Sequence, residues 1–186
     1  MGLKRFVIDG YGQVELNQVA FRRDGRIEAQ CALGDDFNDV SAENGMLLSV
    51  NNVKRVVNFP KSGEIYPVAL NYTTEHMYDE RANGLKDFKL DKGEFLPRLG
   101  YLAVGDKFTT NCLCYDDAEF ASDEALIEAY AAVETTPLYG TVSTMGAIKV
   151  TKTKPSAGVV LLAVLGTGAG SMPDGQFGMK FHVAAV

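Results

Sequence analysis

The sequence has little of the material from which metal centres and disulfide frameworks are built. Its 186 residues contain three cysteines, two histidines and no tryptophan. An odd number of cysteines argues against a disulfide scaffold, so we expect reduced thiols. Cys112 and Cys114 form a Cys-x-Cys pair, but the other candidate ligands, Cys31, His76 and His182, follow no zinc spacing. We therefore predict no metal site and interpret the cysteines as side chains that fill a β core.

Long apolar runs and clustered basic residues are absent as well. The longest apolar run, residues 159–165, is far below the roughly 20 residues of a membrane-spanning helix. Lys4 and Arg5 are not followed by the apolar segment of a secretory signal. A formal net charge of -6 disfavours binding to nucleic-acid phosphates or to anionic membranes. We therefore expect a protein that is made in the cytoplasm and whose partners include neither nucleic acid nor a membrane.

Short alternating segments dominate what the sequence does contain. Apolar and polar residues alternate over residues 26–33, which predicts a strand with Cys31 in the core. The preceding strand changes phase, so we expect a bulge near Asn17-Gln18. Val19 and Phe21 continue that strand, and Asp24-Gly25 between the two segments indicates a hairpin turn.

The middle of the chain repeats this pattern. Residues 45–59 predict a second hairpin with Asn51-Asn52 as its turn. Pro67 indicates an edge strand or the start of a strand. Gly105-Asp106 predicts a tight turn, after which Phe108, Thr110, Cys112 and Cys114 are expected to share one face.

One helix stands out among the strands. Ser122 is a good N-cap, acidic residues follow it, and Leu126, Ile127 and Tyr130 are expected on one side. With roughly nine to eleven short strands, the pattern predicts one mainly β domain over residues 1–186. Its expected form is an antiparallel β-sandwich or barrel with long loops or arms and one short accessory helix. Residues 1–14 are a possible N-terminal arm, and residues 73–93 an extended excursion.

The glycine-rich segment at residues 166–170 follows an apolar run and invites comparison with a nucleotide-binding loop. A dinucleotide fingerprint needs a helix after the glycines and then a second parallel strand. Here Pro173, an Asp174-Gly175 turn and an alternating strand follow, and the Gly-Lys-Ser/Thr of a P-loop is missing. We interpret the segment as a connection between two strands of a hairpin.

The remaining polar residues predict no catalytic set. The acidic clusters at residues 34–39 and 115–120 do not follow the ligand order of an EF-hand and are interpreted as turns. No nucleophile signature accompanies His76 or His182. Aromatic residues are not interleaved with Lys and Arg as on a base-stacking surface. We therefore expect no catalytic residue, no cofactor and no enzymatic activity.

Three segments resemble proteins of tailed-bacteriophage virions. Residues 44–73, "NGMLLSVNNVKRVVNFPKSGEIYPVALNYT", look like the core of head decoration (cement) proteins. Residues 100–112 are similar to a strand-Gly-Asp-strand segment of head and tail accessory proteins, and residues 172–183 resemble the closing hairpin of such components. The resemblance implies a structural protein of the virion that binds the outer surface of an assembled capsid.

This resemblance implies the partners and a location in the virion, on the surface of the capsid. The partner would be the major capsid protein or another virion protein, and self-association as a trimer or a monomeric state both stay open. Irregular segments can become ordered on a lattice, so residues 1–14 and 73–93 are the expected contact elements. The alternatives are another virion component of the tail or connector, and a cytosolic β-barrel that binds a small ligand.

Overall fold

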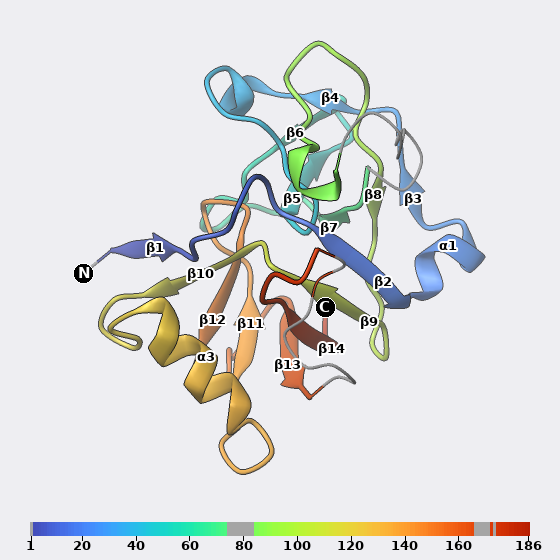
Figure 1. Cartoon of the computed structure of the whole chain (residues 1–186). Helices are drawn as coiled ribbons and strands as arrows, with labels where there is room; N and C mark the ends of the chain where they lie inside the picture. The colour runs from blue at the N-terminus through green and yellow to red at the C-terminus, as the bar shows by residue number, and fades with distance from the viewer. Residues whose placement is uncertain (1, 74–83, 166–171, 173) are drawn as a thin grey trace.

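The computed structural model describes residues 2–73, 84–165, 172 and 174–186. These residues form fourteen strands in two sheets, which confirms the predicted mainly β fold (Figure 1). The two sheets lie against each other in the manner of a sandwich. Helix α3 (Asp123–Ala131) is the accessory helix expected after Ser122, whose side chain accepts a hydrogen bond from the Ala125 amide at 3.3 Å.

The larger sheet contains eight strands. In spatial order they are β1 (Leu3–Arg5), β10 (Leu113–Asp116), β12 (Ile148–Thr151), β11 (Tyr139–Thr141), β13 (Val160–Val164), β14 (Met179–Ala185), β9 (Lys107–Thr110) and β2 (Val14–Gln18). All neighbours pair antiparallel except β10 and β12, which are parallel. The predicted bulge in β2 is confirmed by a register shift between Glu15 and Gln18.

The smaller sheet contains six strands and curls strongly. In spatial order they are β3 (Ile27–Glu28), β8 (Leu99–Gly100), β7 (Val68–Asn71), β5 (Leu47–Asn51), β6 (Val56–Asn58) and β4 (Ala32–Leu33). The edge strands β3 and β4 are consecutive in the chain, and the four steps from Glu28 to Ala32 span at most about 14 Å. The edges of a flat six-stranded sheet would lie about 24 Å apart. The sheet must therefore bend until its edges approach, as in a small barrel.

Two apolar clusters form the core. The first lies between the sheets and includes Phe108, Phe181 and Leu161 of the larger sheet with Leu47 and Leu70 of the smaller one. The second lies within the curl of the smaller sheet and includes Phe37, Leu48, Val57, Ala69 and Leu99. Successive residues of β5 and β7 enter different clusters, because side chains alternate across a strand. The central strands β5 and β7 are therefore buried on both faces.

The segment after β2 is a helix, and the hairpin predicted there is wrong. Helix α1 (Ala20–Asp24) ends at Gly25, whose φ of 70° is that of a helix C-cap. Asp106, which lies in a distant turn, caps the N-terminus of this helix, because its Oδ1 accepts a hydrogen bond from the Ala20 amide at 2.7 Å. Phe21 on this helix is fully buried. A long-range cap and one buried ring thus override the local strand pattern.

The strand predicted over residues 26–33 is divided in two. β3 and β4 take its ends, and residues 29–31 cross between the edges of the smaller sheet. Cys31 is buried in the second cluster, as expected. The short crossing leaves too little chain for one continuous strand.

The predicted hairpin of β5 and β6 is confirmed, but its turn is longer than expected. Asn51 pairs with Val56, so residues 52–55 form the turn. The Asn51 Oδ1 accepts from the Lys54 amide at 3.0 Å, and Arg55 has a positive φ of 56°. Pro67 lies directly before β7, which confirms its prediction as a strand start.

The expected common face from Phe108 to Cys114 is wrong. Phe108 lies in the first cluster, whereas Cys112 and Cys114 lie in the second. Residues 111–112 separate β9 from β10, so the alternation is interrupted there. On α3, Leu126 and Tyr130 are buried but Ile127 is 37% exposed, so the predicted apolar side is narrower than expected.

The first residues of the chain pass between the two sheets. The dark-blue segment after β1 runs across the middle of the molecule to β2 (Figure 1). Phe6 is buried in the first cluster, and its amide donates to the Leu113 carbonyl at 3.0 Å. In this structure residues 2–14 therefore lie on the body of the protein.

The second expected contact element is described in part. Residues 74–83 lie outside the described residues. After them come the 3-10 helix η2 (Leu85–Asp87) and an isolated bridge between Leu90 and Ala42. Another 3-10 helix, η1 (Asp35–Phe37), occupies the acidic cluster at residues 34–39.

Candidate binding groove

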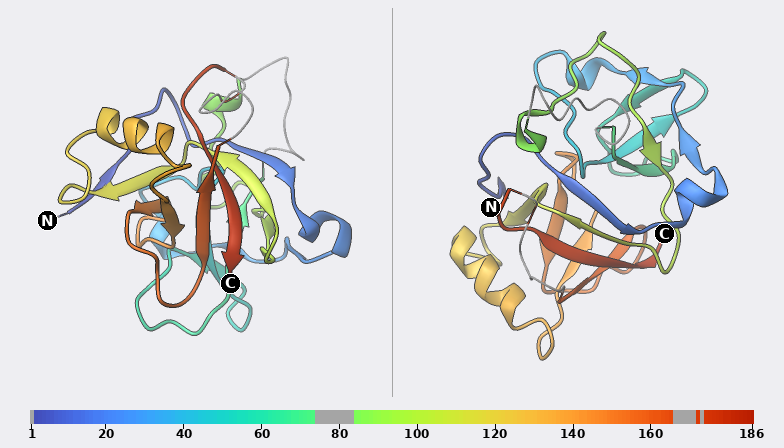
Figure 2. Two further views of the ribbon diagram at one scale, coloured as in Figure 1. Left: turned by 90° about the horizontal axis from the view of Figure 1, so that it is seen from below. Right: turned by 45° about the vertical axis from the view of Figure 1, so that its right-hand side comes forward.

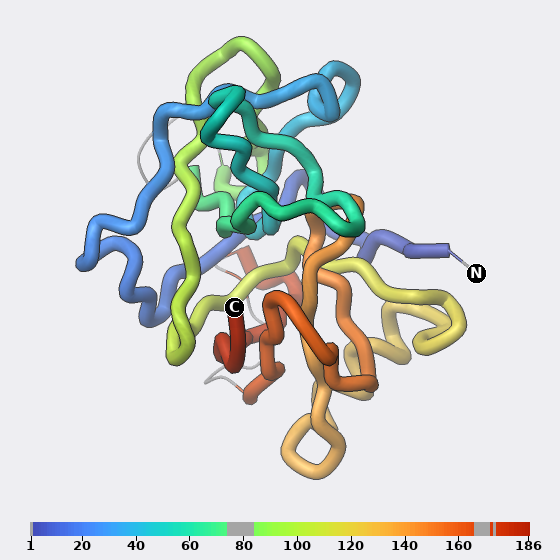
Figure 3. Tube along the Cα trace, turned by 180° about the vertical axis from the view of Figure 1, so that it is seen from behind, coloured from blue at the N-terminus to red at the C-terminus, as the bar shows by residue number. Residues whose placement is uncertain are grey.

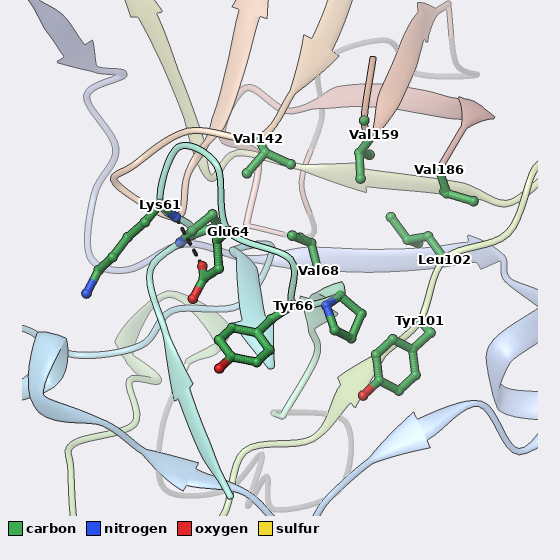
Figure 4. A pocket seen from close by; sticks show the side chains of 12 residues that line it. Lys61, Glu64, Tyr66, Val68, Tyr101, Leu102, Val142, Val159 and Val186 are labelled. Carbon is green, nitrogen blue, oxygen red and sulfur yellow. Dashed lines mark hydrogen bonds between the residues drawn. The ribbon is translucent and has the colours of Figure 1, made fainter. Parts of the chain in front are cut away.

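An apolar groove of about 470 Å³ opens where the two sheets meet (Figure 4). Tyr66 and Tyr101 lie on one side, and Val142, Val159 and Val186 on the other. The first side belongs to segments next to β7 and β8 of the smaller sheet, and the second to the ends of β11, β13 and β14 of the larger sheet. Pro60, Lys61, Glu64, Pro67, Val68, Leu102 and Gly158 complete the lining. The groove is thus a feature of the joint between the sheets.

The long segment between β6 and β7 forms one lip of the groove. The Lys61 amide donates to Glu64 Oε2 at 3.2 Å, and the Lys61 ammonium lies 3.3 Å from Asp36 Oδ1. Seen from behind, the trace from β5 to β7 (teal to green) lies beside the turn before β12 (orange), where the Leu47 amide donates to the Gly146 carbonyl at 2.8 Å (Figure 3). The lip is therefore tied to η1, and the neighbouring strand β5 is tied to the turn before β12 of the larger sheet.

Aromatic and aliphatic groups give the groove its chemistry. Burial raises the pKa of the Tyr101 hydroxyl, although a hydrogen bond with Asn52 acts in the opposite direction. The hydroxyl is therefore neutral at physiological pH. Together with the valines opposite, this surface suits an apolar side chain or a small apolar molecule.

An exposed aliphatic side chain stands on the same lip. Ile65, between the lining residues Glu64 and Tyr66, is 91% exposed. Val186 on the opposite side is 63% exposed. Apolar side chains that gather at the rim of an apolar groove are typical of surfaces that bind other molecules.

The three cysteines lie apart from the groove and inside the fold. Cys112 and Cys114 are fully buried, and Cys31 is buried beside β4. Burial raises the pKa of the Cys112 thiol to about 12 and that of Cys31 to about 11. Burial also raises the pKa of Cys114, whose thiol donates to the Ala147 carbonyl at 3.6 Å. The core-filling interpretation therefore agrees with where the thiols lie.

We expect these thiols to react slowly with a disulfide reagent at pH 8 while the protein is folded. The thiolate is the reactive form. Burial limits the access of the reagent to each thiol, and the raised pKa lowers the fraction of thiolate. Ellman's reagent measures this directly. All three thiols should react within minutes in 6 M guanidinium chloride, and rapid native reaction of Cys112 would contradict the burial described here.

The other predicted candidates are dispersed. His182 is a half-buried residue of β14, opposite Lys107 and Leu162, and His76 lies outside the described residues. Residues 166–170 also lie outside them, but β13 and β14 on either side pair antiparallel. That pairing agrees with a hairpin connection and differs from the parallel strands of a dinucleotide fold.

The acidic clusters take part in local structure. Asp35 pairs with Lys92 at 2.7 Å, and this hydrogen bond and charge lower the pKa of the Asp35 carboxyl. Tyr115 donates to Asp123 Oδ1 at 2.6 Å, and burial together with this bond raises the Tyr115 pKa to about 12. Within the described part of the chain, no three His, Cys, Asp or Glu side chains are grouped as metal ligands. No helix among the described residues has the length and hydropathy to cross a membrane.

The sequence reasoning missed the groove, because its residues are scattered from Pro60 to Val186. Ile65 does indicate an exposed apolar site in the sequence, since it is a large aliphatic residue within a polar connecting segment. Comparison with protein-family models, with curated proteins and with solved structures finds no match to this chain.

Proposed function

We propose that this chain is a non-enzymatic structural protein of a virion, which binds the surface of the assembled capsid and stabilises it. The observation that carries the proposal is the apolar groove with Ile65 exposed on its lip. The resemblance of residues 44–73 to decoration proteins supports the same function, and this segment includes the lip itself. An apolar segment of a capsid subunit is the proposed occupant of the groove.

Burial of Ile65 in such a contact would contribute measurably to its affinity. Complete burial of an isoleucine side chain contributes roughly 1.5–3 kcal/mol. Buried aromatic residues often dominate the affinity of an interface, and Tyr66 and Tyr101 line one side of the groove. The lining residues flank paired strands, which limits the conformational entropy that is lost on binding.

This proposal places the capsid contact at the groove rather than on an arm. Residues 2–14 are tied to the body by contacts along their length. Deleting them would remove β1 and a buried phenylalanine, Phe6, from the fold. Point substitutions at the groove are therefore the sharper test of capsid binding.

Replacing Ile65 by aspartate should weaken binding to intact heads by at least about tenfold, since a loss of 1.4 kcal/mol changes the dissociation constant by that factor. The measurement is co-sedimentation of the purified chain with intact heads and, separately, with dissociated capsid subunits. Val53→Asp is the matched control, because Val53 is 88% exposed on the β5–β6 turn and is not part of the groove lining. Both variants should keep the wild-type thermal midpoint.

Equal co-sedimentation of the two variants would remove the groove from the capsid contact. Failure of the wild-type chain to sediment with any heads would remove the proposed function itself. The two results are distinguishable because the first compares the two variants, whereas the second concerns the wild-type chain.

A small apolar ligand is the second candidate function. The groove volume of about 470 Å³ lies within the usual range of ligand pockets, about 300–1,000 Å³. An apolar fluorescent probe such as ANS, displaced by a fatty acid or another apolar compound with a micromolar dissociation constant, would support this candidate. Ile65→Asp should affect that binding less than Val159→Asp, because Val159 lines the groove and Ile65 stands on its lip.

A further inference from the structure

The segment from residue 6 to residue 13, here called the N-terminal strap, is fixed by the buried ring of Phe6 and by its backbone amides. Four of these amides donate to side chains elsewhere in the protein. The pairs are Val7 to Asp123 Oδ2 at 3.0 Å, Asp9 to Gln176 Oε1 at 2.8 Å, Gly12 to Glu43 Oε2 at 2.5 Å and Gln13 to Asn111 Oδ1 at 2.7 Å. The Tyr11 amide donates to the Lys86 carbonyl at 2.7 Å.

The partners of the strap come from widely separated parts of the fold. They belong to α3, to the connection before β14, to the segment before β5, to the link between β9 and β10, and to η2. The closest of these side-chain partners in sequence, Glu43, is 31 residues from Gly12. The residues that contact the strap, here called the channel, are therefore distant in sequence, and Val7, Asp9 and Gly10 of the strap stay exposed to solvent.

The strand before the strap adds two further contacts with the same channel. β1 is three residues long, and among the described strands it pairs with β10 alone, at the edge of the larger sheet. Arg5 reaches Glu43 Oε2 at 2.7 Å, and both side chains are largely buried. Glu43 thus binds the guanidinium of β1 and the Gly12 amide of the strap with one carboxylate oxygen.

The channel fits its occupant closely. A Cβ atom added to Gly12 would lie 2.7 Å from the Asn44 carbonyl oxygen and 3.0 Å from the Cys112 Cβ. Neither backbone nor core can move easily at that point, so a larger residue would not fit. The channel is therefore selective for a glycine at this position.

We propose that residues 2–13 form a detachable unit, and that the channel they occupy accepts the same segment from a second copy of this chain. Each side-chain contact of the segment described above is with residues at least 31 positions away, so an identical segment from another molecule makes the same contacts. β2 stays attached through β9, which leaves the junction of Gln13 and Val14 as the hinge. Exchange of an identical element is a low-cost route to association. This inference does not depend on the proposed capsid partner.

The test uses a fluorescein-labelled peptide of residues 2–13, GLKRFVIDGYGQ, and the full-length chain. Arg5→Met in the chain loosens its own segment and leaves the channel unchanged. The peptide should bind the Arg5→Met chain at least tenfold more tightly than it binds the wild-type chain, as measured by fluorescence anisotropy. A peptide with Gly12→Val should not bind.

Arg23→Met is the matched control, because Arg23 forms an exposed ion pair with Asp24 at 2.8 Å on α1. This variant should bind the peptide as weakly as the wild-type chain does. Equal binding of the peptide to the Arg5→Met and wild-type chains would overturn the exchange.

Hydrogen exchange of the wild-type chain tests independently whether residues 2–13 detach as a unit, even where Arg5→Met fails to fold. The amides of Val7, Asp9 and Gly12 should exchange together and faster than those of β13 and β14. Exchange of all these amides at the single rate of global unfolding would show that the segment does not detach as a unit, and would overturn the proposal.

Discussion

Phe21→Ala should lower the free energy of unfolding by about 3–5 kcal/mol, the range observed for phenylalanine-to-alanine changes in protein cores. Phe21 is fully buried, and its ring lies 5.1 Å from that of Tyr72, centroid to centroid. Gly100 of β8 leaves the space for the ring, since a Cβ added there would lie 2.5 Å from the Phe21 Cδ2. The ring fills a place that neighbouring side chains cannot reach, so its loss leaves a cavity.

Urea denaturation followed by circular dichroism measures this change. Arg23→Ala is the control on the same helix, and it should change stability by less than about 0.5 kcal/mol because its side chain is 82% exposed. A loss below about 1 kcal/mol for Phe21→Ala would mean that α1 contributes little to the core. Gly100→Val should be destabilising as well, because its side chain and the ring of Phe21 need the same space.

Glu43→Ala should lower the free energy of unfolding by about 3 kcal/mol. The substitution leaves the Arg5 guanidinium without its partner in a largely buried site, a change that typically costs about 3–5 kcal/mol. It also removes the acceptor of the Gly12 amide. The lower end of that range is expected, because the Glu43 side chain is 19% exposed and water can reach part of the site.

Glu43→Gln is the matched variant for this prediction. Its amide oxygen can still accept from Gly12, so the loss should be about half that of Glu43→Ala. Unfolding of Arg5→Met, alone and combined with Glu43→Ala, distinguishes the two contributions, because the non-additivity of the two changes measures the ion pair. Equal stability of Glu43→Ala and the wild-type chain would show that the N-terminal segment does not stabilise the fold.

Much of the architecture follows from local sequence patterns. The alternation of Met179, Phe181 and Val183 predicts β14, and all three side chains are fully buried. Ser122 predicts the start of α3, and Pro67 the start of β7. In each case a short stretch of sequence already contains the determining interaction: a period of two, an N-cap or a missing amide hydrogen.

The features that local patterns did not predict are set by distant residues. Asp106 caps the start of helix α1, and the absence of a side chain at Gly100 leaves room for the ring of Phe21. Cys112 turns away from the face of Phe108 because residues 111–112 lie between β9 and β10, where the strand alternation is interrupted. The groove brings together Tyr66, Tyr101 and Val159 from separate connections. Such arrangements depend on how the sheets pack, which no single window of sequence contains.

The position of β14 has a consequence for how the protein is made. This strand follows β9 and β13 in the sequence, yet it lies between them in the larger sheet (Figure 2). During synthesis on the ribosome, β9 and β13 therefore cannot pair with β14 until residues 179–185 have been translated. Translation products that end earlier would carry two open strand edges within one sheet, and such edges promote aggregation. Incomplete chains should therefore precipitate or be degraded.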